Sequence, residues 1–358
     1  MSGNNGWTSR DRIAAALAHR EADRIALSDS PWGTAVTRWR VEGLPADVSP
    51  FDYFGYEMAG FGSDVSAQLP TEVVEETEEY RIERTSNGTL MRNWKHSTST
   101  PEMIDFTIKT AEDWERYRDC FKMQPNRISL DGLEHHRRCR EKGYWVHFNA
   151  AFGYDKTQGI IGSENLLMAM VAEPDWIADM FMVAADLVIE TASAMMNAGY
   201  VFDGAFMFDD MGYRNGTLFS PNVFRSLEKA AHAKVYDFFH SKGLPVILHS
   251  CGCVEEFIPD LIDAGLDCLQ PLETKAGMDL VKLKELYGDK LSFMGGIDVR
   301  KMCDPDPDVI EEEVRTKILC AKKGGGYIYH SDHSVPDNVS FSQYCRVIEL
   351  VNEHGAYA

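Results

Sequence analysis

Hydrophobic and polar positions follow two different patterns along the chain, and the change comes near residue 144. Beyond it, short apolar runs lie at Trp145–Phe148, Gly204–Phe208, Val246–Leu248, Cys268–Gln270, Leu291–Met294 and Tyr327–Tyr329. Longer segments between them, at 175–198, 221–242, 254–264, 279–287 and 308–323, are predicted to be helices. This repetition of strand and helix indicates a parallel sheet with helical crossovers.

The first third of the chain has a weaker pattern. An apolar helix face precedes a first predicted strand at Arg24–Leu27. Residues 30–68 hold many aromatic side chains without clean periodicity. Asn87-Gly88 is a hairpin-turn pair between strand-like runs, so an antiparallel hairpin is expected at 72–94.

These patterns give seven strands, and an eighth is expected in the irregular first third. A TIM-type (β/α)₈ barrel and a doubly wound sheet both fit this order. No Gly-x-Gly-x-x-Gly follows the first strand and no phosphate-binding loop is found, which favours the barrel. We therefore expect one α/β barrel domain over residues 1–358, with an irregular and hairpin insertion at about 30–100.

Composition narrows the class of protein. Hydrophobic residues make up 44% and charged residues 26%, as in a folded soluble protein. The net charge of −20 argues against nucleic acid and anionic membranes as partners. No apolar run reaches about 18 residues, and the first residues lack the apolar core of a secretory signal. Eight irregularly spaced cysteines form no disulfide framework, so we expect a cytoplasmic protein.

Chemically active side chains follow nearly every predicted strand. In a barrel, the catalytic residues come from the C-terminal ends of the strands, which share one rim. The residues in question are Asp209, Asp210, His249, Cys251, Cys253, Glu273, Asp298, His330, Asp332 and His333.

His249 and Cys251 are the strongest of these signals, because two residues apart at a strand end they project to the same side. Imidazole and thiolate are zinc ligands, and a catalytic zinc uses about three protein ligands with one open position. We predict His333 as the third ligand, supported by Asp332, with Glu273 as an additional or exchangeable ligand. Cys253 is a lower-ranked choice. The alternatives are that Cys251 and His249 are simply buried, and that His333 contacts substrate instead of metal.

Asp209 and Asp210 suggest acid–base chemistry or anchoring of a substrate. Neighbouring residues at a strand end point to opposite sides. One of the two carboxylates is therefore expected to face the centre, and the other to cap the following structure.

Several segments together resemble the uroporphyrinogen decarboxylase superfamily. They are Phe208–Gly212, Phe219–Pro221, Gly243–Gly252, Ala264–Asp267, Gln270–Glu273, Gly295–Asp298 and Gly325–Ile328. The resemblance implies the barrel fold. One branch decarboxylates uroporphyrinogen without a metal and carries Arg-Gln-Ala-Gly-Arg-Tyr near its N-terminus. The corresponding residues 30–40 lack that motif, so we do not expect a true uroporphyrinogen decarboxylase.

The other branch resembles the methylcobalamin:coenzyme M methyltransferases, which bind zinc through His-x-Cys and a later Cys. His249 and Cys251 match, but the loop 330–336 has no Cys. The resemblance implies a zinc-dependent methyltransferase that moves a methyl group between a corrinoid on a partner protein and a small acceptor, such as a thiol or tetrahydrofolate.

In that scheme zinc is a Lewis acid held by His249, Cys251 and His333, with Glu273 completing the site. Asp209 or Asp210 positions the substrate or its proton. Two alternatives stay open: a decarboxylase-like or demethylating barrel enzyme acting on a small substrate, and a non-catalytic partner of a corrinoid protein. The sequence leaves open the methyl donor, the acceptor, the direction of transfer and the oligomeric state, including a homodimer.

Overall fold

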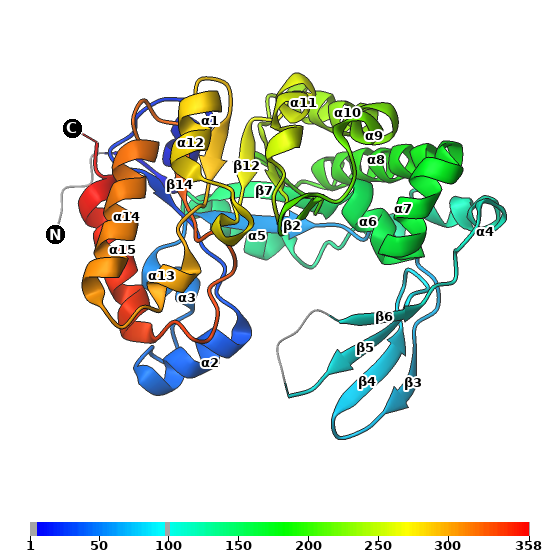
Figure 1. Ribbon diagram of the computed structural model, residues 1–358, viewed down its shortest axis with the longest axis horizontal. Helices are drawn as coiled ribbons and strands as arrows, with labels where there is room; N and C mark the ends of the chain where they lie inside the picture. Colours follow the sequence, from blue (N-terminus) through cyan, green and yellow to red (C-terminus); the bar gives the residue numbers. More distant parts are fainter. Residues whose placement is uncertain (1–5, 97–100, 358) are drawn as a thin grey trace.

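Eight parallel strands form the centre of the molecule (Figure 1). The computed structural model describes residues 6–96 and 101–357. The strands are β1 (Ala26–Leu27), β2 (Met58–Gly62), β7 (Trp145–Ala151), β8 (Gly204–Phe208), β11 (Val246–His249), β12 (Cys268–Gln270), β13 (Ser292–Met294) and β14 (Tyr327–Tyr329). Their order is β1-β14-β13-β12-β11-β8-β7-β2, and every pairing is parallel. The predicted TIM-type barrel is confirmed.

The two end strands of this order meet at Glu57. Its backbone N–H donates to the Leu27 carbonyl at 2.9 Å, and its side chain accepts from the Leu27 N–H at 2.6 Å. Arg12 and Arg24 form ion pairs with the same carboxylate, which is nearly fully buried. These hydrogen bonds link β1 to the residue that precedes β2, at the two ends of the strand order.

The eighth strand, β2, does lie in the first third of the chain, as expected. The sequence did not reveal the position of β2, because two residues of this strand are glycines. A Cβ atom at Gly60 would lie 2.7 Å from the His147 ring, and one at Gly62 would lie 2.4 Å from Asn149. Glycine is therefore needed where β2 passes the side chains of β7, at the expense of the alternating pattern that marks a strand.

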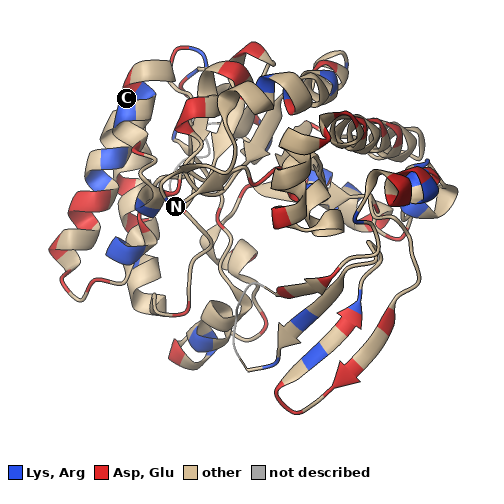
Figure 2. Ribbon diagram, turned by 45° about the vertical axis from the view of Figure 1, so that its right-hand side comes forward, with Lys and Arg blue, Asp and Glu red and all other residues tan. Residues whose placement is uncertain are grey.

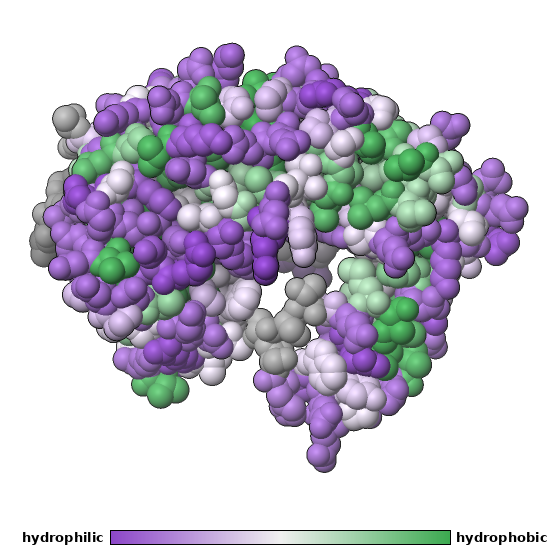
Figure 3. All heavy atoms as spheres, in the orientation of Figure 1, coloured by the Kyte–Doolittle hydropathy of each residue, from purple (hydrophilic) through white to green (hydrophobic). Residues whose placement is uncertain are grey.

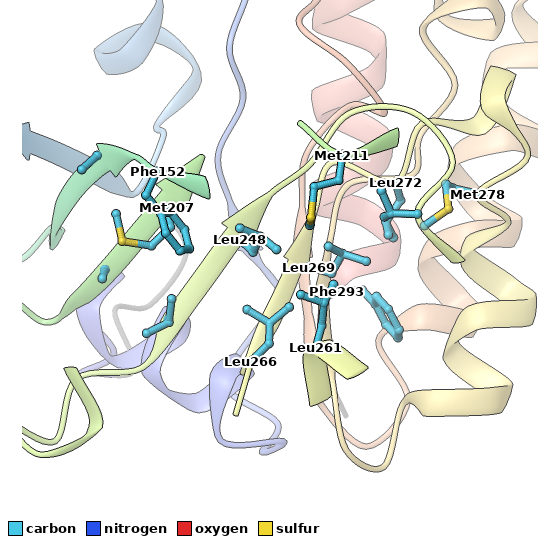
Figure 4. Close-up of a cluster of buried hydrophobic side chains, with 14 of the residues drawn as sticks. Phe152, Met207, Met211, Leu248, Leu261, Leu266, Leu269, Leu272, Met278 and Phe293 are labelled. Atoms are coloured by element: carbon cyan, nitrogen blue, oxygen red, sulfur yellow. The ribbon is translucent and has the colours of Figure 1, made fainter. Parts of the chain in front are cut away.

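Helices surround the barrel (Figure 1). They are α1 (Ser9–Leu17), α2 (Gly33–Glu42), α3 (Pro50–Phe54), α4 (Ala111–Tyr117), α5 (Leu133–Glu141), α6 (Gly153–Ile161), α7 (Ser163–Ala172), α8 (Pro174–Asn197), α9 (Pro221–Val223), α10 (Lys229–His240), α11 (Ile258–Asp263), α12 (Leu280–Tyr287), α13 (Val299–Met302), α14 (Pro307–Ala321) and α15 (Phe341–Gly355). The predicted helix at 221–242 is interrupted by a π-helical turn, η3 (Phe224–Glu228). Between the strands and the helices lies an apolar core that includes Met207, Leu248, Leu269 and Leu261 (Figure 4).

The barrel interior has an apolar floor and a polar chamber above it. Each strand gives one side chain to the floor, and α1 packs on it: Ala26, Met58, Trp145, Phe206, Ile247, Cys268, Met294 and Ile328, together with Ile13, Ala16 and Leu17. Side chains alternate along a strand, so the next inward position is two residues further on. On five of the strands that position is polar, namely Ser28, His147, His249, Gln270 and His330.

The insertion between β2 and β7 carries an antiparallel sheet of four strands, β3 (Glu72–Glu76), β4 (Tyr80–Arg84), β5 (Leu90–Trp94) and β6 (Glu102–Asp105). The predicted hairpin is present, with Asn87-Gly88 in the β4–β5 turn. Residues 97–100 of the predicted insertion lie outside the described residues. Figure 1 shows this sheet projecting from the barrel below α6 and α7.

Charged residues are spread over the outer helices and the four-stranded sheet (Figure 2). The face in Figure 3 is mostly hydrophilic, with scattered apolar residues. Among the described residues, no helix has the length and apolar character needed to cross a membrane.

Candidate metal centre

A cavity of about 470 Å³ opens at the C-terminal ends of the strands. It is lined by Ser28, Asp29, Ser30, Phe51, Met58, His147, Phe206, Phe208, Asp210, His249, Cys251, Gln270, Pro271, Met294, His330, His333 and Ser334. The rim predicted from the strand ends is thus the mouth of a chamber whose floor is apolar.

Asp210, His249 and Cys251 form a cluster of metal-ligand side chains at this cavity. Their ligand atoms all lie within 4.8 Å of one another. His249 Nε2 is 3.3 Å from Cys251 Sγ and 3.5 Å from Asp210 Oδ1. The Cys251 N–H also donates to Asp210 Oδ1 at 2.8 Å, which ties the two loops together. One nitrogen, one sulfur and one carboxylate oxygen make a donor set that suits zinc.

Gln270 fixes the orientation of the His249 ring. His249 Nδ1 lies 2.5 Å from Gln270 Oε1. An amide oxygen only accepts hydrogen bonds, so Nδ1 carries the proton and Nε2 keeps its lone pair. That lone pair faces Cys251 and Asp210. A partner that fixes the tautomer of a histidine in this way is a regular feature of metal sites.

The same glutamine connects His249 with a second histidine. Gln270 Nε2 lies 3.4 Å from His330 Nε2, and His330 Nδ1 lies 2.7 Å from the Ser331 carbonyl oxygen. The carbonyl requires the proton on Nδ1, so His330 Nε2 is an acceptor. A directed hydrogen-bond chain therefore runs from His249 through Gln270 to His330.

Burial governs the protonation of the cluster. It lowers the pKa of His249, so the imidazole is neutral and able to bind a metal. Burial also raises the pKa of the Cys251 thiol, and the charges of Asp210 and Glu273 add to this effect. A cation among these ligands would act in the opposite direction, because it favours the thiolate.

His333 and Glu273, the other predicted ligands, lie beside the cluster. His333 lines the cavity and packs edge-on against Trp32, with ring centroids 5.8 Å apart. Glu273 accepts from the Gly252 N–H at 2.6 Å and pairs with Lys275 at 2.8 Å. Among the described residues, it is Asp210 that completes the group of three around His249 and Cys251.

Two further residues of the predicted rim have structural partners. Asp332 accepts from the backbone N–H groups of Thr274 and Val299, at 2.9 and 3.0 Å. Cys253 donates its N–H to the Tyr213 carbonyl at 2.8 Å. Both hold rim loops in place.

Asp209 points away from the cavity and belongs to a second, fully buried cluster. Its Oδ2 accepts from His232 Nε2 at 2.8 Å, and its Oδ1 accepts from the Asp155 N–H at 2.8 Å, at the start of α6. The hydroxyl of Tyr236 lies 2.8 Å from His232 Nδ1. The two aspartates thus diverge as their adjacent positions predict, with Asp210 at the cavity and Asp209 at a helix terminus.

Glu228 completes this buried cluster. Its Oε1 accepts from the Tyr154 N–H at 2.5 Å, and its Oε2 has no hydrogen-bond partner among the described residues. Burial and the neighbouring charge of Asp209 raise the pKa of Glu228 well above its usual value. Glu228 therefore holds a proton.

Comparison with known proteins decides the family. The sequence pattern described as "Uroporphyrinogen decarboxylase (URO-D)" matches residues 157–354, more than half of the chain. The chain belongs to the uroporphyrinogen decarboxylase family. The matched part includes Asp210, His249 and Cys251.

Two proteins that are similar to this chain are methyltransferases. Methylcobamide:CoM methyltransferase MtaA from Methanosarcina barkeri is 25% identical over 160 residues, which is 44% of this chain and 44% of that protein. The chain thus matches less than half the length of that curated relative. A methyltransferase from Methanosarcina mazei has the same fold, with a TM-score of 0.66 and 17% identity over 97% of this chain and 99% of that one.

The sequence analysis did not identify Gln270, which orients the His249 ring. It also did not identify Asp29 and His147, which line the cavity. A signal existed, because Gln270 and His147 lie two residues after the floor residues Cys268 and Trp145. Inward residues of a strand repeat with that period. Burial lowers the pKa of His147 to about 4, so its ring is neutral.

Proposed function

We propose that this protein is a zinc-dependent methyltransferase that moves a methyl group between a corrinoid on a partner protein and a small co-substrate. The observation that carries the proposal is the cluster of Asp210, His249 and Cys251, which faces a cavity at the C-terminal rim of the barrel. The family and its methyltransferase relatives support the type of reaction.

The three clustered side chains are the proposed zinc ligands. Their donor atoms are already grouped, and Gln270 holds the His249 lone pair toward the other two. When bound there, zinc supplies a Lewis acid that lowers the pKa of a coordinated thiol or hydroxyl group. His333 and Glu273 remain proposed ligands of lower rank. In the favoured assignment His333 contacts the co-substrate, and Glu273 supports Gly252 beside Cys251.

The chain's own residues prepare the cavity for this chemistry. The apolar floor, with Phe206 and Met294, excludes water from beneath the co-substrate. The N–H of Cys251 donates to the Asp210 carboxylate and holds it at the mouth.

The corrinoid is the larger reactant. A corrinoid ring with its side chains does not fit into about 470 Å³ together with a co-substrate. We therefore infer that a carrier protein docks over the mouth and presents only the cobalt-bound methyl group.

Decarboxylation of uroporphyrinogen is not proposed. That substrate carries eight carboxylates, which need well-placed cations for binding. No Lys or Arg is found among the described residues that line the cavity.

An anaerobic assay with methylcobalamin tests the proposal. Zinc-loaded protein is mixed with methylcobalamin and either a thiol or tetrahydrofolate, and loss of the methylcobalamin absorbance is followed. We expect turnover that stops in Cys251→Ala. Zinc binding without turnover with either acceptor, in both directions of transfer and in the presence of a corrinoid protein, would favour the non-catalytic alternative.

A further inference from the structure

The cavity next to the metal cluster has an unusual charge distribution. Its described lining contains two carboxylates, Asp29 and Asp210, and four histidines, but no Lys or Arg. Desolvation lowers the pKa of His147 to about 4, so this ring is neutral. A metal would balance Asp210 and a Cys251 thiolate. The charge of Asp29 would remain.

Asp29 is a carboxylate held in place by hydrogen-bond donors. It accepts from the hydroxyls of Ser331 at 2.5 Å, Tyr344 at 2.8 Å and Tyr329 at 3.2 Å, and from the Ser30 N–H at 2.9 Å. All four donors are uncharged. Asp29 is only 7% exposed, and among the described residues no Lys or Arg forms an ion pair with it. His330 Nδ1 lies 3.6 Å from Asp29 Oδ1, but its proton is donated to the Ser331 carbonyl oxygen at 2.7 Å. The negative charge of Asp29 therefore acts on whatever occupies the cavity, since few water molecules screen it.

Cations are present nearby, but on the other side of Cys251. A separate groove shares Cys251 with the cavity and is lined by Arg214, Lys275 and Arg300. Glycines let the two loops between them approach closely: a Cβ at Gly212 would lie 2.4 Å from the Cys251 carbonyl oxygen. The basic side chains of this rim thus face the groove, and the cavity keeps only acidic and neutral groups.

Aromatic rings add to the preference of the cavity for a cation. Phe206 and Phe208 pack at 5.1 Å between centroids, and Phe208 packs against His249 at 5.3 Å. All three rings line the cavity. The faces of such rings attract cations, most strongly where water is excluded.

We propose that the cavity binds a small organic cation in preference to an anion, so that the methyl-bearing co-substrate is an ammonium compound. Its C–N bond would break as the methyl group passes to cobalt(I) of the corrinoid, giving methylcobalt(III), and the electron pair of that bond would stay on nitrogen in the neutral amine that leaves. The inference that this ligand is the co-substrate rests on the proposed function. The charge preference itself needs neither corrinoid nor turnover.

Three ligands with the same number of non-hydrogen atoms test the preference: phenyltrimethylammonium, uncharged methyl phenyl sulfone and benzenesulfonate. All are weak zinc ligands, so they report on the cavity. Calorimetric titration of zinc-loaded and metal-free protein gives the affinities. We expect the cation to bind at least ten-fold more tightly than the anion in both forms. A smaller difference, the reverse order, or no measurable binding of the cation would overturn the proposal.

Variants locate the effect. Ser28→Leu fills the cavity and should abolish binding of the cation; binding that survives it would contradict the assigned site. Asp29→Asn should reduce the preference for the cation at least three-fold. Because the amide introduced by that substitution has less acceptor capacity than the carboxylate and could weaken the fold, Ser334→Arg is a second route, expected to make the sulfonate the tighter ligand. Val171→Arg, on an exposed position of α7, adds the same charge and should leave the order unchanged.

Failure of this inference and failure of the proposed function are distinguishable. Methyl transfer to a thiol with no preference for the cation would overturn only the inference. A cation preference in a protein that binds no zinc would overturn only the proposed function.

Discussion

Two clusters built from similar residues lie back to back at the end of β8. Asp210, His249 and Cys251 are half-buried and face the cavity, whereas Asp209, Glu228 and His232 are fully buried behind it. Both bring ligand atoms within 4.8 Å of one another. The two clusters differ in the hydrogen-bond partners of their side chains. The inner cluster is closed by helix N–H groups, Tyr236 and the proton of Glu228. The outer cluster borders the cavity, and the lone pair of His249 faces Cys251 and Asp210.

The difference shows that residue types alone do not define a metal site. A buried carboxylate pair with a histidine is stable without a metal when one acid keeps its proton and backbone N–H groups solvate the other. A site for a metal and a substrate also needs space for the ligand. We therefore assign chemistry to the outer cluster and support of α6 to the inner one.

The largest effect is expected from removing an outer ligand. His249→Ala and Cys251→Ala should each lower methyl transfer at least a thousand-fold and reduce zinc content to background, because two remaining ligands hold zinc weakly. Elemental analysis and the methylcobalamin assay measure this. His232→Ala is the matched control from the inner cluster and should retain zinc. Equal zinc loss in all three variants would remove the distinction between the clusters.

The free energy of unfolding should depend more on the inner cluster than on the outer one. His232→Ala leaves Asp209 without its buried partner, so we expect a loss of about 3 kcal/mol in the free energy of unfolding. His249→Ala, whose ring borders the cavity, should cost less than about 1 kcal/mol in metal-free protein. Urea unfolding followed by circular dichroism gives both values. A larger loss in His249→Ala would contradict the division of roles.

Zinc affinities of further variants identify the third ligand of the outer cluster. Asp210→Asn should weaken zinc binding about ten- to hundred-fold, whereas His333→Ala and Glu273→Gln should change it less than about three-fold. Competition with a chelator measures the affinities. Should His333→Ala have the largest effect, the loop after β14 supplies the ligand and Asp210 belongs to the substrate.

A change in the pH dependence of stability, instead of a loss of function, is expected from the inner cluster. The folded-state pKa of Glu228 is raised, so its contribution to stability is fully present below its unfolded pKa of about 4.5 and is lost as pH rises through the folded pKa. Glu228→Gln imitates the protonated form and cannot titrate. The free energy of unfolding of the variant should match that of the wild type near pH 5. Toward pH 8 it should fall less steeply, and the difference between the two slopes should be up to about 1.4 kcal/mol per pH unit. Parallel curves would mean that Glu228 is ionised.

The sequence predicted the barrel because its last two thirds alternate so regularly. It also placed His249, Cys251 and Asp210 at one rim, since strand ends are visible as apolar runs followed by polar residues. Strand β2 could be expected but not located, because Gly60 and Gly62 break its pattern. The cluster around His232 could not be predicted. Its members come from the residue after β8, from η3 and from α10, and only the packing of α10 behind β8 brings them together.

The most direct test of the outer cluster is X-ray absorption at the zinc edge of purified protein. We predict one zinc per chain, with a single sulfur neighbour at about 2.3 Å and nitrogen or oxygen neighbours at about 2.0 to 2.2 Å. The sulfur contribution should disappear in Cys251→Ala and persist in His232→Ala. A zinc shell without sulfur, or purified protein that takes up no zinc, would contradict the assignment of Asp210, His249 and Cys251 as the metal centre.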